Sequence, residues 1–260
     1  MNLNLTGRTA LITGASQGIG EGLASDFAAE GVHLHLTARN AERLEQAKTA
    51  VQNDYDVAVT IHPLDLTESG SCEQLADAVG DIDILVNNAG AIPSGRLEEI
   101  DATAWREGWE LKVMAYVDLC RLFYARMKQA GSGVIVNNIG NSGEVFDPRY
   151  IAGTSGNASL MAFTRALGGH SLDDNIRVVG VNPGPVDTGR IYAMLRKRAA
   201  EVLGDENRFE ELLVRYPRNR PAHVSEITSL IVFLSSDLSG YTSGTIVTID
   251  GGISSRDSII

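Results

Sequence analysis

The chain has 260 residues, of which 22 are Lys or Arg and 33 are Asp or Glu, giving a formal net charge of −11. Because this balance offers no basic excess to neutralise phosphates, it argues against a nucleic-acid partner. No apolar run approaches the roughly 20 residues of a membrane span, and the N-terminus lacks the regions of a signal peptide. We therefore expect a cytoplasmic protein with no membrane partner.

Short apolar runs that are typical of strands alternate with segments of helical periodicity along the whole chain. The predicted strands are residues 8–13, 32–37, 57–61, 82–86, 133–138, 176–181 and 244–249. This alternation predicts a parallel sheet with helices on both faces. No linker, repeat or low-complexity tract interrupts it. We therefore predict an α/β fold, a single doubly wound Rossmann-type domain over residues 1–260, with a sheet of about seven strands.

Residues 13–20 read Thr-Gly-Ala-Ser-Gln-Gly-Ile-Gly and are the most informative segment of the chain. They follow the first predicted strand and precede a helical pattern, which is the geometry of a nucleotide-phosphate site. We expect Gly14 to permit the tight turn, Gly18 to let the pyrophosphate approach the backbone and Gly20 to allow close helix–sheet packing. The predicted cofactor-binding residues of this turn are Gly14, Ser16, Gln17, Gly18, Ile19 and Gly20.

The spacing Gly-x-x-x-Gly-x-Gly resembles the turn of the short-chain dehydrogenase/reductase family. Asn87-Asn88-Ala89-Gly90 is similar to the motif after the family's fourth strand, residues 182–188 to its Pro-Gly-x-x-x-Thr segment, and residues 239–252 to its C-terminal strand. These segments keep the family's order and spacing across essentially the whole chain. The resemblance implies that Asp65 contacts adenine and that Thr188 holds the nicotinamide carboxamide. It extends the predicted cofactor-binding set by Asp65, Leu66, Asn88, Ala89, Gly90, Pro183, Gly184, Val186 and Thr188.

The end of the second predicted strand, residues 36–40, bears on the choice between NAD and NADP. In Rossmann folds an acidic residue there hydrogen-bonds the adenosine ribose of NAD, whereas an arginine suits the 2′-phosphate of NADP. By the family pattern, Ala38 stands where the aspartate would be, and Arg39 follows it. We therefore predict NADP, with NAD as the alternative. Gln17 argues the other way, because relatives that prefer NADP often carry a basic residue at its position.

The four catalytic residues of the family, an Asn, a Ser and a Tyr-x-x-x-Lys pair, are all missing here. In the family the Tyr hydroxyl passes a proton to the substrate oxygen, while the Lys lowers the pKa of the Tyr and binds the nicotinamide ribose. Residues 163–167 fix the register of the catalytic helix. The Asn, Ser, Tyr and Lys positions then fall on Lys112, Gly140, Gly153 and Asn157, respectively.

The residues at the Asn and Lys positions, Lys112 and Asn157, are a reciprocal exchange of the family pair. We hypothesise that Lys112 places its ammonium near the end of the usual lysine while Asn157 hydrogen-bonds the ribose; chance is the alternative explanation. Tyr150, about one helical turn before Gly153, is a candidate proton donor. Ser142 is a candidate for the missing Ser. A water admitted by the two glycines is an alternative proton donor.

Residues 188–222 depart from the strand–helix rhythm and form a long, charged insertion. Its apolar residues suggest an amphipathic helix. Because this region covers the substrate in the resembling family, we predict a substrate lid. The run Arg196-Lys197-Arg198 either clamps an acidic substrate or forms a solvated face, and we favour the solvated face.

Histidine and cysteine side chains, the commonest soft metal ligands, form no metal-binding pattern in this sequence. His33 and His35 lack a third ligand, and Cys72 and Cys120 lack metal spacing, so we predict no metal site and two reduced packing cysteines.

The resemblance implies a homotetramer or homodimer. The apolar tail, residues 258–260, either docks on a neighbouring subunit or frays.

The retained cofactor frame predicts an NADP-dependent oxidoreductase that transfers hydride between nicotinamide and a carbonyl or alcohol, with a non-standard catalytic set. The loss of all four catalytic residues motivates an alternative, an NADP(H)-binding redox sensor or scaffold without turnover. A further alternative is a non-redox lyase on the same fold, which the retained glycine turn disfavours.

Overall fold

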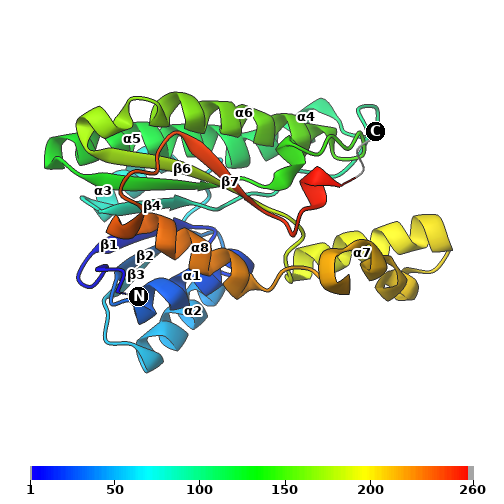
Figure 1. The fold of residues 1–260 in the computed structure, drawn as a ribbon, viewed down its shortest axis with the longest axis horizontal. Helices are drawn as coiled ribbons and strands as arrows, with labels where there is room; N and C mark the ends of the chain where they lie inside the picture. The colour runs from blue at the N-terminus through cyan, green and yellow to red at the C-terminus, as the bar shows by residue number, and fades with distance from the viewer. Residues whose placement is uncertain (1, 257–260) are drawn as a thin grey trace.

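The computed structural model describes residues 2–256 and builds them around a seven-stranded parallel sheet (Figure 1). The strands are β1 (Thr9–Thr13), β2 (His33–Ala38), β3 (Val59–Pro63), β4 (Ile84–Asn87), β5 (Gly133–Asn138), β6 (Ile176–Pro183) and β7 (Thr245–Ile249). Their order in the sheet is β3-β2-β1-β4-β5-β6-β7. The strand order reverses between β1 and β4, so a ligand is expected at the carboxyl ends of these two strands.

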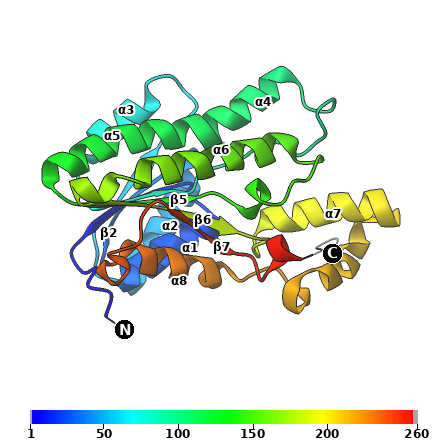
Figure 2. The ribbon, with the colours of Figure 1, turned by 45° about the horizontal axis from the view of Figure 1, so that its top comes forward.

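Helices cover both faces of the sheet, as Figures 1 and 2 show. On one face lie α1 (Gly18–Ala29), α2 (Ala41–Asp54) and α8 (Val224–Ser235); on the other lie α3 (Ser71–Val79), α5 (Ala115–Ala130) and α6 (Ile151–Gly168). Successive strand residues point to opposite faces. In β1, for example, Ile12 packs in the α1 core and Leu11 in the α5 core. The predicted Rossmann-type α/β fold is confirmed, with each strand boundary within two residues of its expected place.

The apolar residues at spacings of three and four between positions 103 and 129 predict one long helix, but the structure interrupts it. α4 (Ala102–Trp109) is followed by a π-helical turn, η1 (Glu110–Met114), before α5 begins. Asp101 caps α4, since its side chain accepts hydrogen bonds from the N–H groups of Thr103 and Ala104. A π-bulge inside a helix is typical of functional sites, because it redirects the side chains that it carries. Here it carries Lys112.

The histidine and cysteine side chains to which we assigned packing roles lie within or between the elements of the sheet and its helices. His35 Nδ1 lies 2.9 Å from His62 Nε2 across neighbouring strands, and the two rings stack. Cys72 and Cys120 are buried and unpaired. Over residues 2–256 the structure groups no three metal-ligating side chains and has no helix long and apolar enough to cross a membrane. The tail, residues 258–260, lies outside the described part of the chain.

The insertion predicted at residues 188–222 contains α7 (Gly189–Leu203) and the 3-10 helices η4 (Glu206–Arg215) and η5 (Pro217–Asn219). α7 is the expected amphipathic helix, and it buries Leu195 and Ala199. In Figures 1 and 2 this segment, yellow to orange, extends away from the sheet and lies next to η7 (Ile253–Ser255), shown in red.

Candidate functional site

A cleft of about 1340 Å³ opens at the carboxyl ends of the central strands. The loops that follow β1, β4, β5 and β6 form its walls, and segment 188–222 forms its outer side. The predicted cofactor-binding residues that line it are Gly14, Ser16, Gln17, Gly18, Ile19, Arg39, Leu66, Asn88, Ala89, Gly90, Pro183, Gly184, Val186 and Thr188. The four residues proposed for catalysis, Lys112, Ser142, Tyr150 and Asn157, line the same cleft. The predicted cofactor-binding residues and the predicted catalytic residues therefore line the same cleft.

The glycine turn after β1 packs against the loop after β4. Gly14 has φ +66°, and a Cβ built on it would lie 2.9 Å from Ala89 Cα. A Cβ on Gly20 would lie 2.2 Å from the Gly14 carbonyl oxygen, so Gly20 packs behind the turn and does not line the cleft. Gln17, the N-cap of α1, has an extended backbone and no side-chain cap bond. The first N–H groups of α1 are therefore available to an anion in the cleft.

The end of the cleft beside β2 carries two arginines. Arg39 Nη1 lies 3.6 Å from Asp65 Oδ2, which places Asp65 beside the cleft rather than in its lining. Arg43, from the first turn of α2, lines the cleft and donates a hydrogen bond to Gln17 Oε1. We did not predict Arg43. The sequence could have indicated it, because it follows Arg39 by four residues and lies on the first turn of a helix that begins at Ala41.

Lys112 is buried at the base of the cleft. Its Nζ donates hydrogen bonds to the Asn138 carbonyl oxygen at 2.7 Å and to Tyr116 Oη at 2.9 Å. Its stem crosses Gly90, where a Cβ would lie 2.6 Å from Lys112 Cδ. Burial, and to a lesser degree the charge of Arg190, lowers the pKa of Lys112 to about 7. A protonated ammonium has three donors, so one remains for a ligand.

Asn157, on α6, holds the loop after β5. Its Nδ2 donates to Ser142 Oγ at 2.6 Å and to the Gly140 carbonyl oxygen at 3.3 Å. Among residues 2–256, the buried Oδ1 atoms of Asn157 and Asn138 have no hydrogen-bond partner. Buried polar atoms are rarely left unsatisfied. These two acceptors are therefore suited to the hydroxyl groups of a ligand in the cleft.

Tyr150 fills the space in front of Gly153. A Cβ built on Gly153 would lie 2.0 Å from Tyr150 Cε1. Tyr150 Oη accepts a hydrogen bond of 2.9 Å from Nη2 of Arg190, and Nη1 of Arg190 donates to the Gly90 carbonyl oxygen at 3.2 Å. Tyr150 thus presents its hydroxyl within the same cleft as Lys112.

Arg190 is the functional candidate that sequence reasoning missed. It lies two residues after Thr188, whereas the predicted candidates for an acid clamp were residues 196–198, further along the same helix. Arg196 stacks over the ring of Phe209 at 4.9 Å, and Arg198 pairs with Glu201 at 3.0 Å. None of the three basic residues of that run is among the residues that line the cleft, which agrees with the solvated face that we favoured.

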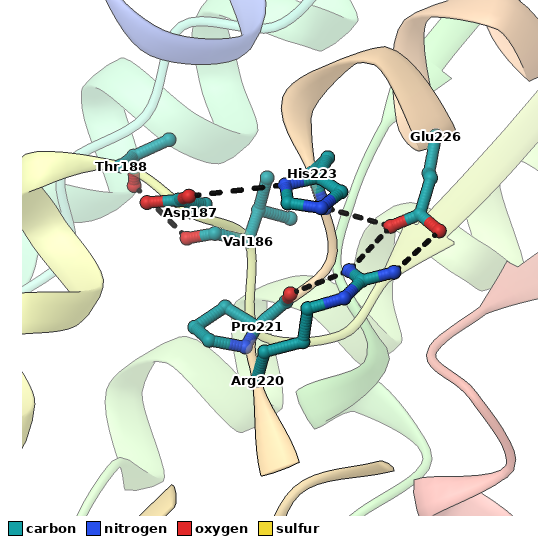
Figure 3. Close-up of polar contacts among 7 residues, drawn as sticks. All are labelled: Val186, Asp187, Thr188, Arg220, Pro221, His223 and Glu226. Atoms are coloured by element: carbon teal, nitrogen blue, oxygen red, sulfur yellow. Dashed lines mark hydrogen bonds and ion pairs between the residues drawn. The ribbon is translucent and has the colours of Figure 1, made fainter. Parts of the chain in front are cut away.

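The two ends of segment 188–222 lie side by side, since the N–H of Asp187 donates to the Ala222 carbonyl oxygen at 2.8 Å, and polar side chains surround this junction (Figure 3). Arg220 donates to both carboxylate oxygens of Glu226, at 2.8 and 3.0 Å, and His223 Nδ1 lies 3.9 Å from Asp187 Oδ2. The Arg220 hydrogen bonds, together with the backbone N–H of His223, lower the pKa of Glu226 to about 2. The segment is therefore anchored at its base, and its helices project from that anchor.

Comparison with known proteins gives a match over almost the whole length. A family model described as "Enoyl-(Acyl carrier protein) reductase" matches residues 14–254. The chain belongs to the short-chain dehydrogenase/reductase family. The predicted short-chain NAD(P)-dependent oxidoreductase is confirmed at the level of the family.

Three proteins of known activity are similar to this chain in sequence or in structure. The chain is 30% identical over 254 residues to the 2-keto-3-deoxy-L-fuconate dehydrogenase of Xanthomonas campestris, covering 96% of this chain and 81% of the relative. The L-sorbose reductase of Gluconobacter frateurii, solved with NADPH and L-sorbose, has a TM-score of 0.91 and 30% identity, with 99% and 100% of the chains covered. A 7α-hydroxysteroid dehydrogenase solved with NADH has a TM-score of 0.85 and 26% identity, with 96% of each chain covered.

The residues of this short-chain dehydrogenase/reductase fit a dinucleotide. The uncapped N-terminus of α1 suits the diphosphate, and the glycine turn leaves room for it, since a Cβ on Gly18 would lie 3.2 Å from Thr188 Cγ2. The amide oxygens of Asn138 and Asn157, which have no hydrogen-bond partner within residues 2–256, suit ribose hydroxyls.

Proposed function

We propose that the protein is an NADP-dependent oxidoreductase that transfers hydride between nicotinamide and a polyhydroxylated carbonyl or alcohol compound, with Tyr150 as the proton donor. The observation that carries the proposal is the position of Tyr150. Its ring takes the volume of a side chain at Gly153, and its hydroxyl lies in the cleft that also holds the cofactor-binding turn. A hydroxyl so placed supplies the proton that carbonyl reduction requires.

The preference for NADP is supported by the cations beside β2. Arg39 and Arg43 line that end of the cleft, and Ala38 leaves no carboxylate at the position that selects NAD. Guanidinium groups bind phosphate through charge-assisted, often paired hydrogen bonds. The similar L-sorbose reductase was solved with NADPH, which agrees with this preference.

Each residue of the altered catalytic set has a defined task. The cofactor supplies or accepts the hydride when bound. Tyr150 Oη gives a proton to the substrate oxygen in reduction and takes it back in oxidation. Ser142, held by Asn157, donates a hydrogen bond to the same oxygen. Lys112, with its remaining N–H, and Asn157, with its free Oδ1, hold the ribose, which is the exchange predicted from the sequence.

The substrate class is supported by relatives and by the outer end of the cleft. The names of two similar proteins mention a ketose, L-sorbose, and a keto sugar acid, 2-keto-3-deoxy-L-fuconate. The outer end is lined by Arg190, Arg215 and Tyr216, all from segment 188–222, and these side chains offer hydrogen-bond donors to hydroxyl and carboxylate groups. We assign this segment as the substrate lid.

A substrate screen tests the proposal. Ketoses, keto sugar acids and the matching alcohols are offered with NADPH or NADH, and simple aliphatic ketones of equal size serve as controls. We expect turnover with at least one polyhydroxylated compound, a higher kcat/KM with NADPH than with NADH, and weak activity on the controls. Preference for the aliphatic ketones would overturn the substrate class. Preference for NADH would overturn the cofactor assignment.

A further inference from the structure

The guanidinium of Arg190 joins three parts of the chain that are distant in sequence. Arg190 lies in the first turn of α7, in segment 188–222. It donates to Tyr150 Oη at 2.9 Å, next to the start of α6, and to the Gly90 carbonyl oxygen at 3.2 Å, in the loop after β4. Among the residues 2–256, no carboxylate forms an ion pair with it within 4 Å. Its charge is therefore directed at the cleft rather than at a neighbouring acid.

The other charged groups around Tyr150 do not replace Arg190. Asp147 and Arg149, on the loop before α6, pair with each other at 2.8 Å. Lys112, from η1, is bonded to the Asn138 carbonyl oxygen and to Tyr116, and burial lowers its pKa to about 7. At neutral pH its charge is therefore partial. Arg190 is the cation that donates a hydrogen bond to the Tyr150 hydroxyl, at 2.9 Å.

We propose that Arg190 is a positioning residue that orients the Tyr150 hydroxyl and stabilises its phenolate, supplying from the lid the positive charge that the family places at position 157. This inference rests on the proposed function. When the Tyr150 O–H bond breaks, the proton joins the electron pair on the substrate oxygen. The phenolate that remains lies beside the guanidinium until a proton from water restores the phenol. An adjacent cation favours this charged form.

This assignment links the lid to the chemistry. Segment 188–222 contributes Arg190, and its two ends are held together by the backbone hydrogen bond from Asp187 to Ala222 and by the contact of His223 with Asp187 (Figure 3). The proton donor then acts fully only while α7 lies over the cleft. In the family pattern the catalytic cation is on the same helix as the tyrosine; in this chain the two come from different elements that pack together.

A double-mutant cycle tests the pair directly. Because Tyr150→Phe removes the hydroxyl that Arg190 contacts, Arg190→Gln should lower kcat strongly in the wild-type background and only weakly in the Tyr150→Phe background. Arg190→Lys should keep most of the wild-type kcat. Arg196→Gln, a charge loss on the same helix outside the cleft, should leave kcat unchanged. An equal loss of kcat from Arg190→Gln in both backgrounds overturns the inference.

Turnover separates this inference from the proposed function. With the best substrate of the screen, Arg190→Gln should lower kcat by about 10²-fold, as loss of a charge-stabilising donor does. The Kd for NADPH, measured by fluorescence titration, should change by less than about threefold, as expected for a side chain outside the phosphate contacts. If Tyr150→Phe turns over as the wild type does, the proposed proton donor fails. If Tyr150→Phe is inactive while Arg190→Gln keeps its kcat, only the role of Arg190 fails.

Discussion

The ring of Tyr150 occupies the volume that a side chain at Gly153 would need, with Cε1 of the tyrosine 2.0 Å from a Cβ built on the glycine. Tyr150 is the N-cap residue of α6, and Gly153 lies in the first turn of that helix. The two positions are one helical turn apart and share a face. Because Gly153 has no side chain, the ring of Tyr150 can reach the cleft from the start of the helix.

Replacing Gly153 by alanine should displace Tyr150. The added Cβ collides with the tyrosine ring, and a catalytic group misplaced by about 1 Å costs roughly 10²-fold in rate. Stability should hold, because alanine is favoured over glycine inside a helix by up to about 1 kcal/mol. Steady-state kinetics and thermal unfolding measure the two effects. Gly169→Ala, just past the other end of the same helix, is the control. Unchanged kcat in Gly153→Ala would contradict the placement of Tyr150.

Tyr150→Phe removes the hydroxyl and keeps the ring. Loss of a general acid lowers turnover by about 10²- to 10⁴-fold. The ring still fills the space at Gly153, so the Kd for NADPH should stay near the wild-type value. Stopped-flow hydride transfer and fluorescence binding give the two numbers. Tyr124→Phe is a matched control, since that hydroxyl bonds Asp174 on the surface away from the cleft. A parallel loss of binding and turnover would point to a structural role for Tyr150.

Lys112→Met should stabilise the protein without cofactor in a pH-dependent way. The pKa of Lys112 is about 7 in the folded protein, against 10.5 as its ordinary value. Between these values the unfolded chain binds more protons, so the stability of the wild type rises with pH. The advantage of the methionine variant is therefore largest below the folded pKa, and it shrinks by roughly 1.4 kcal/mol per pH unit as pH rises above it.

Urea unfolding across that pH interval measures the Lys112 effect. Met keeps the apolar stem and loses the hydrogen bonds of Nζ to Asn138 and Tyr116, which offsets part of the gain by a pH-independent amount. The slope against pH is thus the diagnostic quantity. A stability difference that is constant with pH would show that burial does not depress the pKa of Lys112.

Arg39→Ala and Arg43→Ala should each weaken NADPH binding and spare NADH binding. A hydrogen bond to a charged group contributes about 1.5–3 kcal/mol, which corresponds to roughly a 10- to 100-fold rise in the Kd for NADPH. Calorimetric titration with both cofactors gives the ratio. Arg165→Ala, an exposed change on α6, should alter neither Kd. Equal losses for NADPH and NADH would place both arginines away from the 2′-phosphate.

The sequence allowed the fold and much of the cleft to be predicted, because these depend on local patterns. Glycine at positions 14, 18 and 20 indicates a tight turn and close backbone packing, and apolar runs indicate the strands. Contacts between distant side chains leave no such pattern. Arg190 therefore escaped notice although Thr188, two residues earlier, was singled out. The π-helical turn that carries Lys112 was missed as well, since the helical periodicity continues through it.

The reciprocal pair Lys112 and Asn157 shows where sequence reasoning reached its limit. Their positions predicted a shared site, and both side chains line the cleft. The sequence did not reveal that Lys112 turns toward the Asn138 carbonyl oxygen or that Asn157 holds Ser142. That the two side chains hold one ribose stays a prediction.

The central claim is that this altered catalytic set transfers hydride with Tyr150 as the proton donor. The most direct measurement uses NADPH carrying deuterium at the reactive C4 position, with wild type and Tyr150→Phe incubated with ketoses and keto sugar acids under matched conditions. We predict deuterium in an alcohol product with the wild type, and at least about a hundredfold less with Tyr150→Phe. Bound NADPH with no deuterium transferred to any product would contradict hydride transfer and favour a redox sensor that binds NADP(H) without turnover.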